Sequence, residues 1–362
     1  MKVKLGELTK IRTGKLDANA SSPDGEYPFF TCSKEPLKIS SYSYDCECVL
    51  VAGNGDLNVK YYNGKFDAYQ RTYIIEDNSN GRLYLPYLYY FMNGYVEELR
   101  KLSIGGVIKY IKLRNLTDAL IELPDIETQK YIVSILSKIK ELIDSRYQEL
   151  KILENLIKAR FVEMFGDNQE VHKLSDIAAI TGGLTKNSRR DKIELRKPYL
   201  RVANVFFASI DTTEILDIGL TKEEYEKTLL RNGDLLFVEG NGSPDQIGRV
   251  AIWNGEIEDC VHQNHLIKAR FDLKRMNPVF AMYYFISERG RNQIKKRAVS
   301  TSGLYTLSVS KIADFEIPNP PMELQQQFAA FVAAIDKSKA TVQKALDETQ
   351  LLFDSLMQQY FG

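Results

Sequence analysis

The fold of this chain is decided by residues 126–166, which read IETQKYIVSILSKIKELIDSRYQELKILENLIKARFVEMFG and contain no proline and, before Gly166, no glycine. Apolar residues recur there in alternating steps of four and three, the heptad spacing of a coiled-coil seam. The spacing predicts one long helix that buries a single apolar stripe. The stripe consists of Ile132, Leu136, Ile139, Ile143, Leu150, Leu153 and Ile157.

A second stretch of the same kind lies at residues 322–362, MELQQQFAAFVAAIDKSKATVQKALDETQLLFDSLMQQYFG. At about 1.5 Å per residue, each helix would be roughly 60 Å long. Neither would be stable alone in water, so each must bury its seam. Their matched length favours pairing with each other; the alternative is two unrelated amphipathic helices in separate cores. The second seam consists of Phe328, Val332, Ile335, Val342, Leu346, Phe353 and Leu356.

Both stretches belong to an internal duplication of the chain. Glu127 and Gln129 recur as Glu323 and Gln325, and the two tails align without a gap. Before the tails the matches continue, but with changing offsets. Gly53-Asn54-Gly55 recurs as Gly240-Asn241-Gly242, and Tyr89-Tyr90-Phe91 as Tyr283-Tyr284-Phe285. Each copy therefore has a variable head and a tail of constrained length.

The heads contain short apolar stretches bounded by Gly, Asn and Asp, which predict strands. Each head also has a proline-initiated aromatic segment that predicts a short helix, at Pro86–Met92 and Pro278–Ile286. The predicted fold class is α+β, with two mixed heads whose cores are rich in β-structure. The predicted strands are Cys48–Ala52, Tyr73–Ile75, Asp234–Val238, Val250–Trp253 and Leu266–Ala269.

Composition sets limits on function. The 362 residues include 48 basic and 48 acidic side chains, so the net charge is zero and a protein-wide basic field is excluded. The N-terminal residues contain no apolar run of the secretory type, and no apolar run is long enough to cross a bilayer. Four cysteines favour a reduced, cytoplasmic protein over a disulfide scaffold.

Motifs for catalysis are absent from the sequence. It contains no phosphate-binding Gly-x4-Gly-Lys-Ser/Thr motif. Asn319-Pro320-Pro321-Met322 approaches the Asn-Pro-Pro-aromatic box of amino-methyltransferases, but methionine replaces the aromatic residue. Cys260, His262 and His265 could ligate a metal, yet a strand would not place all three on one face. We therefore expect a non-catalytic chain that itself holds no metal and no cofactor.

Basic and amide residues gather in corresponding loops of the two heads. Lysine and arginine position proteins on phosphates, while Asn, Gln and Arg read base edges. A solvated surface is the alternative for any single residue, so the prediction depends on the agreement between copies. The candidate DNA-binding residues are Lys15, Asn54, Asn58, Lys60, Gln70, Arg71, Lys101, Lys109, Lys186, Asn187, Arg189, Arg190, Asn241, Ser243, Gln246, Arg249, Gln263, Asn264, Lys295, Lys296, Arg297 and Tyr305.

Taken together, the chain resembles the specificity (S) subunits of type I restriction–modification systems. The resemblance lies in the order head, helix, head, helix, and in the linker Leu123-Pro124-Asp125-Ile126-Glu127-Thr128-Gln129. Gly-Asp-Leu-Leu-Phe at 233–237 and Ile-Gly-Arg-Val-Ala at 247–251 also match, whereas the first head is more divergent. The division implied is 1–125 and 166–322 for two target recognition domains, with 126–165 and 323–362 as the long helices.

The resemblance implies a mechanism. Each head would read one half of a bipartite, asymmetric site in double-stranded DNA, and an antiparallel pair of helices would fix the separation of the half-sites. Two methyltransferase (M) subunits would dock on the chain and bring S-adenosylmethionine. Restriction (R) subunits would add ATP and Mg²⁺ in complexes that also cleave. None of these cofactors, and no membrane, would be bound by this chain.

Two other classes of protein compete with this interpretation. A methyltransferase or fused restriction enzyme would need the cofactor-binding and catalytic motifs that are missing. A coiled-coil scaffold with two interaction heads would have the same outline and would never touch DNA. A DNA-binding assay with and without M subunits separates the scaffold from the specificity subunit.

Overall fold

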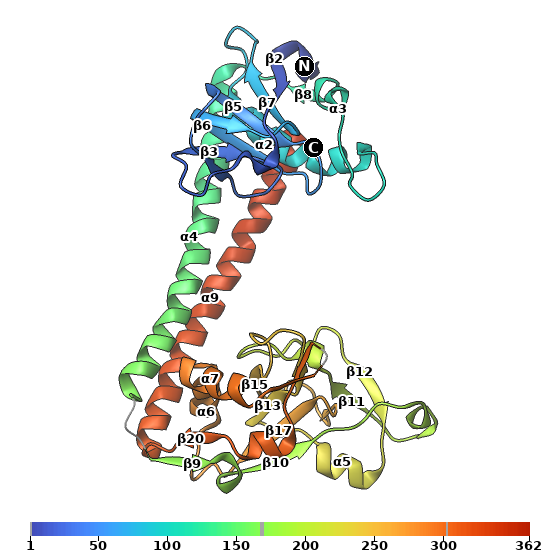
Figure 1. Ribbon diagram of the computed structural model, residues 1–362, viewed down its shortest axis with the longest axis vertical. Coiled ribbons are helices and arrows are strands. Elements are labelled where there is room, and N and C mark those ends of the chain that lie inside the picture. Colours follow the sequence, from blue (N-terminus) through green and yellow to red (C-terminus); the bar gives the residue numbers. More distant parts are fainter. Residues whose placement is uncertain (1, 167–169, 302) are drawn as a thin grey trace. The chain divides into compact units, whose positions relative to one another are not determined.

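The computed structural model describes residues 2–166, 170–301 and 303–362 (Figure 1). The chain divides into two compact units. Unit 1 joins Met1–Gln148 to Val342–Gly362, and unit 2 is Glu149–Thr341. Each unit therefore contains one head together with half of each long helix, instead of a head alone. The boundaries at 125, 165 and 322 remain a prediction.

Unit 1 is built on a six-stranded sheet with the order β2-β7-β5-β6-β3-β4. All neighbours pair antiparallel except β3 and β6, which run parallel. The apolar residues of β5 and β7 form the middle of the sheet, and Val49, Val51 and Ile75 are fully buried. The strands are β2 (Thr9–Thr13), β3 (Tyr27–Phe30), β4 (Leu37–Ile39), β5 (Tyr44–Ala52), β6 (Val59–Ala68) and β7 (Thr72–Asp77).

One long helix, α2 (Leu85–Leu102), covers this core in unit 1. The expected helix at 86–92 is ten residues too short at its C-terminal end. Gly94 does not stop α2, because Val96 and Leu99 continue its apolar face into the core. A two-stranded ribbon of β1 (Lys2–Lys4) and β8 (Leu120–Glu122) closes the head. The short helices are α1 (Leu5–Leu8), η1 (Ala18–Ala20) and α3 (Leu113–Thr117).

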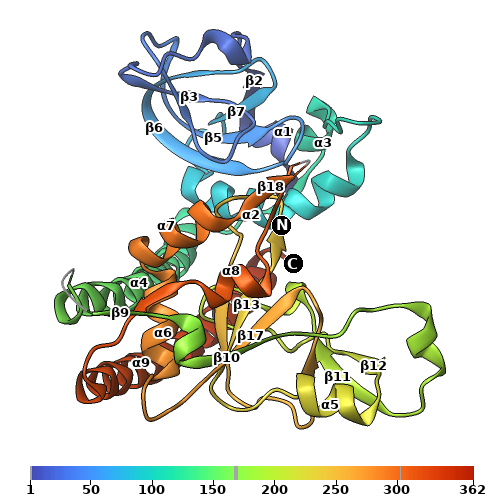
Figure 2. The same cartoon turned by 60° about the horizontal axis from the view of Figure 1, so that its bottom comes forward.

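Unit 2 repeats this topology with its sheet divided into two parts (Figure 2). The order β10-β17-β13-β15 corresponds to β2-β7-β5-β6, and the order β12-β11-β16 corresponds to β4-β3 and the end of β6. The expected strands at 234–238 and 250–253 are observed with those bounds. The strands are β9 (Val171–Lys173), β10 (Ala178–Gly182), β11 (Arg196–Leu200), β12 (Leu216–Gly219), β13 (Asp234–Val238), β14 (Gly240–Asn241), β15 (Val250–Trp253), β16 (Val261–His262), β17 (Leu266–Phe271), β18 (Val299–Thr301), β19 (Leu304–Thr306) and β20 (Glu316–Pro318).

The helices of the second head follow the same plan. α6 (Pro278–Ile286) has the bounds expected from its sequence, and α7 (Glu288–Arg297) continues it after Ser287. Both bury apolar side chains in one aromatic core around Phe237, Phe285 and Phe315. The remaining short helices are η2 (Leu174–Asp176), η3 (Ser188–Lys192), η4 (Val202–Asn204), α5 (Lys222–Thr228) and α8 (Val309–Ala313).

The long helices are α4 (Ile126–Met164) and α9 (Met322–Phe361). In unit 1 the first half of α4 and the last half of α9 contact the same core, and in unit 2 the last half of α4 joins the first half of α9. This pairing is antiparallel. No seam residue predicted from the heptads is exposed, and Glu154 of α4 pairs with Lys339 of α9 at 3.6 Å.

A buried glutamine fastens each long helix to its head. In unit 1 the Gln129 side chain accepts from the backbone N–H of Tyr84 at 2.8 Å and donates to the carbonyls of Arg82 and Pro124 at 2.8 and 2.9 Å. In unit 2 Gln325 accepts from the N–H of Asn277 at 2.8 Å and donates to the Pro320 carbonyl at 2.8 Å. Both glutamines are 0% exposed.

The mixed α+β fold class predicted from the sequence is confirmed, including its two repeated heads and paired long helices. Within the described ranges, no helix combines the length and apolar character needed to span a bilayer.

Candidate nucleic-acid interface

Three strand ends meet at one edge of the first head. Because β2, β7 and β5 are antiparallel neighbours, the end of β2, the start of β7 and the end of β5 lie at the same edge. The Gln70 N–H donates to the Leu16 carbonyl at 2.9 Å, and the Gly53 N–H donates to the Arg71 carbonyl at 2.8 Å. These bonds bring the loops at 14–16, 69–71 and 53–55 together.

A hairpin, residues 104–110, completes this edge. Ile104 and Tyr110 exchange both backbone hydrogen bonds, at 3.0 and 2.8 Å, and Asn54 bridges Tyr110. The Gly55 N–H donates to the Lys109 carbonyl at 3.0 Å. We call the four segments 14–16, 53–55, 69–71 and 104–110 rim 1.

The second head builds the same arrangement from corresponding segments. Leu184 bonds to His262 and Asn264 as Leu16 does to Ala68 and Gln70. The Glu239 N–H donates to the His265 carbonyl at 2.9 Å. The strand pair β14–β19 sets Asn241 opposite Tyr305, so the second hairpin joins the edge as the first does. We call segments 183–190, 239–243, 262–265 and 299–306 rim 2, of which Ser302 lies outside the described residues.

A glycine makes the close approach possible in each rim. A Cβ on Gly14 would lie 2.1 Å from the Ala68 carbonyl oxygen, and one on Gly183 would lie 2.2 Å from that of His262. No side chain fits there, which explains why Gly14 and Gly183 recur in the two copies.

The hydrogen bonds correct one detail of the duplication. The sequence aligns Gly53-Asn54-Gly55 with Gly240-Asn241-Gly242. In the structure Gly53 bonds to Ile111 as Glu239 bonds to Leu307, so Gly53 corresponds to Glu239 and Asn54 to Gly240. The Gly-Asn-Gly sequences are therefore offset by one residue from the structural correspondence.

Some of the candidate DNA-binding residues are exposed to solvent on the two rims. In rim 1, Lys15, Gln70, Arg71 and Lys109 are exposed, and Asn54 is half-buried. In rim 2, Lys186, Asn187 and Arg189 are exposed, and Gln263 and Asn264 are half-buried beside them. Lys15, Arg71, Lys109, Lys186 and Arg189 have no ion-pair partner in the part of the chain that the structure describes. The half-buried Asn241, Ser243, Gln246 and Tyr305 lie on or next to rim 2.

Other candidate side chains form hydrogen bonds and ion pairs within the heads. Arg190 forms a two-pronged ion pair with Glu224 at 2.7 and 2.9 Å and donates to the carbonyls of Thr185 and Gly219. Asn58 donates to the Cys32 carbonyl at 2.8 Å, and Lys60 donates to the Ser33 carbonyl at 2.7 Å and to Asn58. Burial lowers the pKa of Lys60. Arg190, Asn58 and Lys60 thus hold loops of the heads in place, and their role as DNA-binding residues stays a prediction.

The remaining basic candidates lie at the margins of the rims. Lys101 pairs with Glu98 at 3.2 Å, and Lys295 pairs with Asp245 at 2.6 Å. Arg249 lies over the Phe206 ring, where burial lowers its pKa, and Arg297 lies over Phe315 and donates to the Asp314 carbonyl. Lys296 is exposed on α7. These side chains can contribute positive charge, but most are less free than the cations on the rims.

The possible metal ligands Cys260, His262 and His265 do not come together. His262 is buried with its Nδ1 2.9 Å from the Leu266 carbonyl, and His265 is exposed beside Glu239. Burial, aided by the charge of Lys268, lowers the pKa of His262 to about 3. Across the described residues, no three His, Cys, Asp or Glu side chains are grouped to hold a metal ion.

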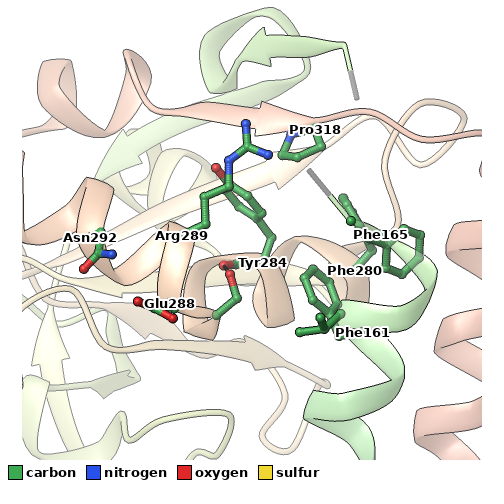
Figure 3. Close-up of a pocket in the computed structure, with 11 residues that line it drawn as sticks. Phe161, Phe165, Phe280, Tyr284, Glu288, Arg289, Asn292 and Pro318 are labelled. Atoms are coloured by element: carbon green, nitrogen blue, oxygen red, sulfur yellow. Dashed lines mark hydrogen bonds between the residues drawn. The ribbon is translucent and has the colours of Figure 1, made fainter. Parts of the chain in front are cut away.

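A well-formed hollow of unit 2 lies away from rim 2, where α4 meets α6 and α7 (Figure 3). Phe161, Phe165 and Phe280 give it an apolar wall, and Glu288 and Arg289 line it from the start of α7. Its volume is about 470 Å³. Its lining also includes Ser287, whose hydroxyl donates to the Tyr284 carbonyl at 2.6 Å.

A comparison with protein families decides what the chain is. The family model "Type I restriction modification DNA specificity domain" matches residues 1–155 and again 166–349, one match for each head. The chain belongs to this family.

Relatives within the specificity family agree. The chain is 39% identical over 174 residues to the type I restriction enzyme EcoDI specificity subunit of Escherichia coli, covering 47% of this chain and 38% of that protein. It is 29% identical over 213 residues to the putative MjaX specificity subunit of Methanocaldococcus jannaschii, covering 58% and 48%. The matched part is thus half or less of the length of these two relatives.

The fold also matches solved structures of specificity subunits. A crystal structure of a type I restriction–modification S subunit from M. genitalium superposes with a TM-score of 0.63 at 17% identity, covering 100% of this chain and 96% of that one. A chain from a study of complex assembly and conformational transition of the type I R-M system gives 0.58 at 15%, with coverage of 100% and 97%. The resemblance to the specificity family is confirmed.

The candidate residues predicted from the sequence omit one feature of rim 1. Val107 and Ile108 stand at the tip of the 104–110 hairpin, 103% and 63% exposed. The search for DNA-binding residues selected basic and amide side chains, so it passed over these two aliphatic residues. The sequence feature that could have revealed them is Gly105-Gly106 followed by two β-branched residues, in a stretch flanked by Lys101 and Lys109.

Proposed function

We propose that this chain is the DNA specificity subunit of a type I restriction–modification complex, in which each rim reads one half of a bipartite site. The observation that carries the proposal is that the chain builds the same loop edge twice, once for each family match. Both edges present cations and amides, the side chains that contact phosphates and base edges.

The chain supplies recognition, and the chemistry belongs to its partners. We propose that two M subunits bring S-adenosylmethionine and methylate the DNA, and that R subunits join in complexes that cleave. Exposed apolar residues on the long helices support a docking role: Leu142, Ile152, Leu156, Leu351 and Leu352 are each more than 40% exposed. Exposed apolar side chains on a helix are a feature of surfaces that dock another subunit.

The experiment that tests the function is a map of modified bases in the host genome with the gene intact and deleted. We expect N6-methyladenine to disappear at one bipartite motif when the gene is removed. Persistence of every methylated motif, in cells shown to express an M partner, would contradict the proposal and favour a scaffold that does not bind DNA.

The rims should also set the salt dependence of DNA binding. Replacing Lys15, Arg71 and Lys109 by glutamine is expected to flatten the plot of log affinity against log salt by about 0.9 for each phosphate that the variant no longer touches. The measurement is a salt titration of the complex with M subunits on the mapped target duplex. The matched control is Lys4→Gln, an exposed lysine of the same head paired with Asp118 at 3.1 Å. An equal change in the control would show that rim 1 does not contact DNA.

The isolated chain should bind DNA weakly, since its net charge is zero and only a few cations are uncompensated. Affinity should rise when M subunits are added, because they enclose the duplex and contribute further phosphate contacts.

A further inference from the structure

The hairpin of rim 1 ends in an aliphatic tip that the structure leaves uncovered. Val107 is fully exposed, and Ile108 is more than half exposed beside it. From Gly105 to Ile108 the loop has no polar side chain, so it can form no side-chain hydrogen bond to a base edge. The side chains of this tip can therefore make only apolar contacts.

The tip is held in place at its base. The two hydrogen bonds between Ile104 and Tyr110 close the hairpin, and the bond from the Gly55 N–H to the Lys109 carbonyl fixes it to the turn after β5. Gly105 has a φ of +119°, and a Cβ there would lie 2.5 Å from the Ile108 carbonyl oxygen. The tight turn therefore projects the two β-branched side chains from a fixed support.

The charge around the tip favours a nucleic acid as the occupant. Between Leu99 and Thr117 the sequence contains five basic residues and no acidic one, although the whole chain is neutral. Arg100, Lys101 and Arg114 are paired with acids from outside this stretch. Lys109 and Lys112, which flank the hairpin, have no acidic partner within the described ranges.

We propose that Val107 and Ile108 act as a wedge that enters the duplex beside the half-site of the first head and partly unstacks one base step. This inference rests on the proposed function and deepens it. Proteins that bind the minor groove frequently insert aliphatic side chains between base steps and so bend the duplex. Unstacking costs least at pyrimidine–purine steps, so the wedge would select a flexible step without any hydrogen bond to it.

The wedge should act at one half-site only. The corresponding loop of the second head reads Thr301-Ser302-Gly303-Leu304, which has one aliphatic residue, Leu304, in place of the adjacent pair Val107-Ile108. The two heads would thus differ in how they read DNA, although their sheets have the same topology.

The test uses the complex with M subunits and the mapped target duplex, in which 2-aminopurine replaces successive adenines. With the natural chain we expect a rise in fluorescence at one step of one half-site, separate from the rise at the adenine that is flipped for methylation. Replacing Val107 and Ile108 by serine should abolish that rise and weaken binding about tenfold. The flipping signal should remain.

Two controls sharpen the result. Lys109→Gln should lower affinity and salt dependence but keep the fluorescence rise, and Leu304→Ser should leave it unchanged. The inference is overturned if no step other than the methylated adenine brightens, or if the double serine variant keeps the rise. Loss of M subunits from the serine variant, with the rise intact, would assign the tip to a protein contact instead. If no bipartite motif exists, no target duplex can be made, and it is the proposed function that fails.

Discussion

Adding one heptad to both long helices is expected to lengthen the spacer between the half-sites by about two to three base pairs. Seven residues add about 10.5 Å of helix, and DNA rises about 3.4 Å per base pair. Because DNA also turns by about a tenth of a turn per base pair, part of the displacement is absorbed as twist. The added twist strains the complex, so the variant should methylate its target more slowly than the natural chain does. Both half-site sequences should stay the same.

The structure indicates where the heptads belong. The division between units falls after Gln148 in α4 and after Thr341 in α9. Glu154 and Lys339, which form an ion pair within unit 2, lie within a few residues of these points. Repeating residues 142–148 and 335–341 keeps both seams in phase. The readout is the set of methylated motifs in cells that carry the variant.

A one-helix insertion is the matched control. Lengthening α4 alone puts its seam out of register with α9, so the variant should unfold at lower temperature and methylate little. Methylation at the original spacing by the doubly lengthened chain would contradict the role of the helices in setting the spacer.

Replacing Gln325 by alanine is expected to lower the free energy of unfolding of unit 2 by about 2–4 kcal/mol. The side chain is fully buried, and its removal leaves the Asn277 N–H and the Pro320 carbonyl without their partners. Gln129→Ala should have a similar effect on unit 1 through the Tyr84 N–H. Urea unfolding followed by circular dichroism measures both.

The neighbouring Gln327→Ala serves as the control, because Gln327 is exposed and has only a long contact to Glu323 at 3.5 Å. We expect its effect to stay within about 0.5 kcal/mol. Equal stability of the Gln325 and Gln327 variants would show that water replaces the missing hydrogen bonds and that the buried glutamine is not a fastening.

The long helices could be predicted from the sequence because a heptad is a local pattern. No glycine or proline interrupts residues 126–164, and the heptad spacing alone indicates which face of the helix is buried. The strands β13 and β15 were equally clear, because glycine and asparagine bound short apolar runs. The extent of α2 was missed because Gly94 resembles a stop, whereas the core contacts of Val96 and Leu99 are tertiary.

The sequence predicted loops that the structure brings together at each rim, but it did not indicate which of their cations are paired within the head. Arg189 and Arg190 look alike in a sequence run of basic residues, yet Glu224, more than thirty residues away, pairs with Arg190 and leaves Arg189 exposed. Lys60 is likewise satisfied by the Ser33 carbonyl on a distant loop. Whether a cation is free depends on such non-local partners, which no short motif records.

The two units differ in how they can form on the ribosome. Unit 2 is one continuous segment, but the core of unit 1 includes Phe353 and Phe361, which pack against Tyr90 and Tyr87 of α2. At about 5–20 residues per second, these aromatic residues emerge roughly 10 to 50 seconds after α2 has been synthesised. The first head therefore keeps an open apolar face until the end of α9 has been made, so shortening α9 should destabilise the head at the opposite end of the sequence.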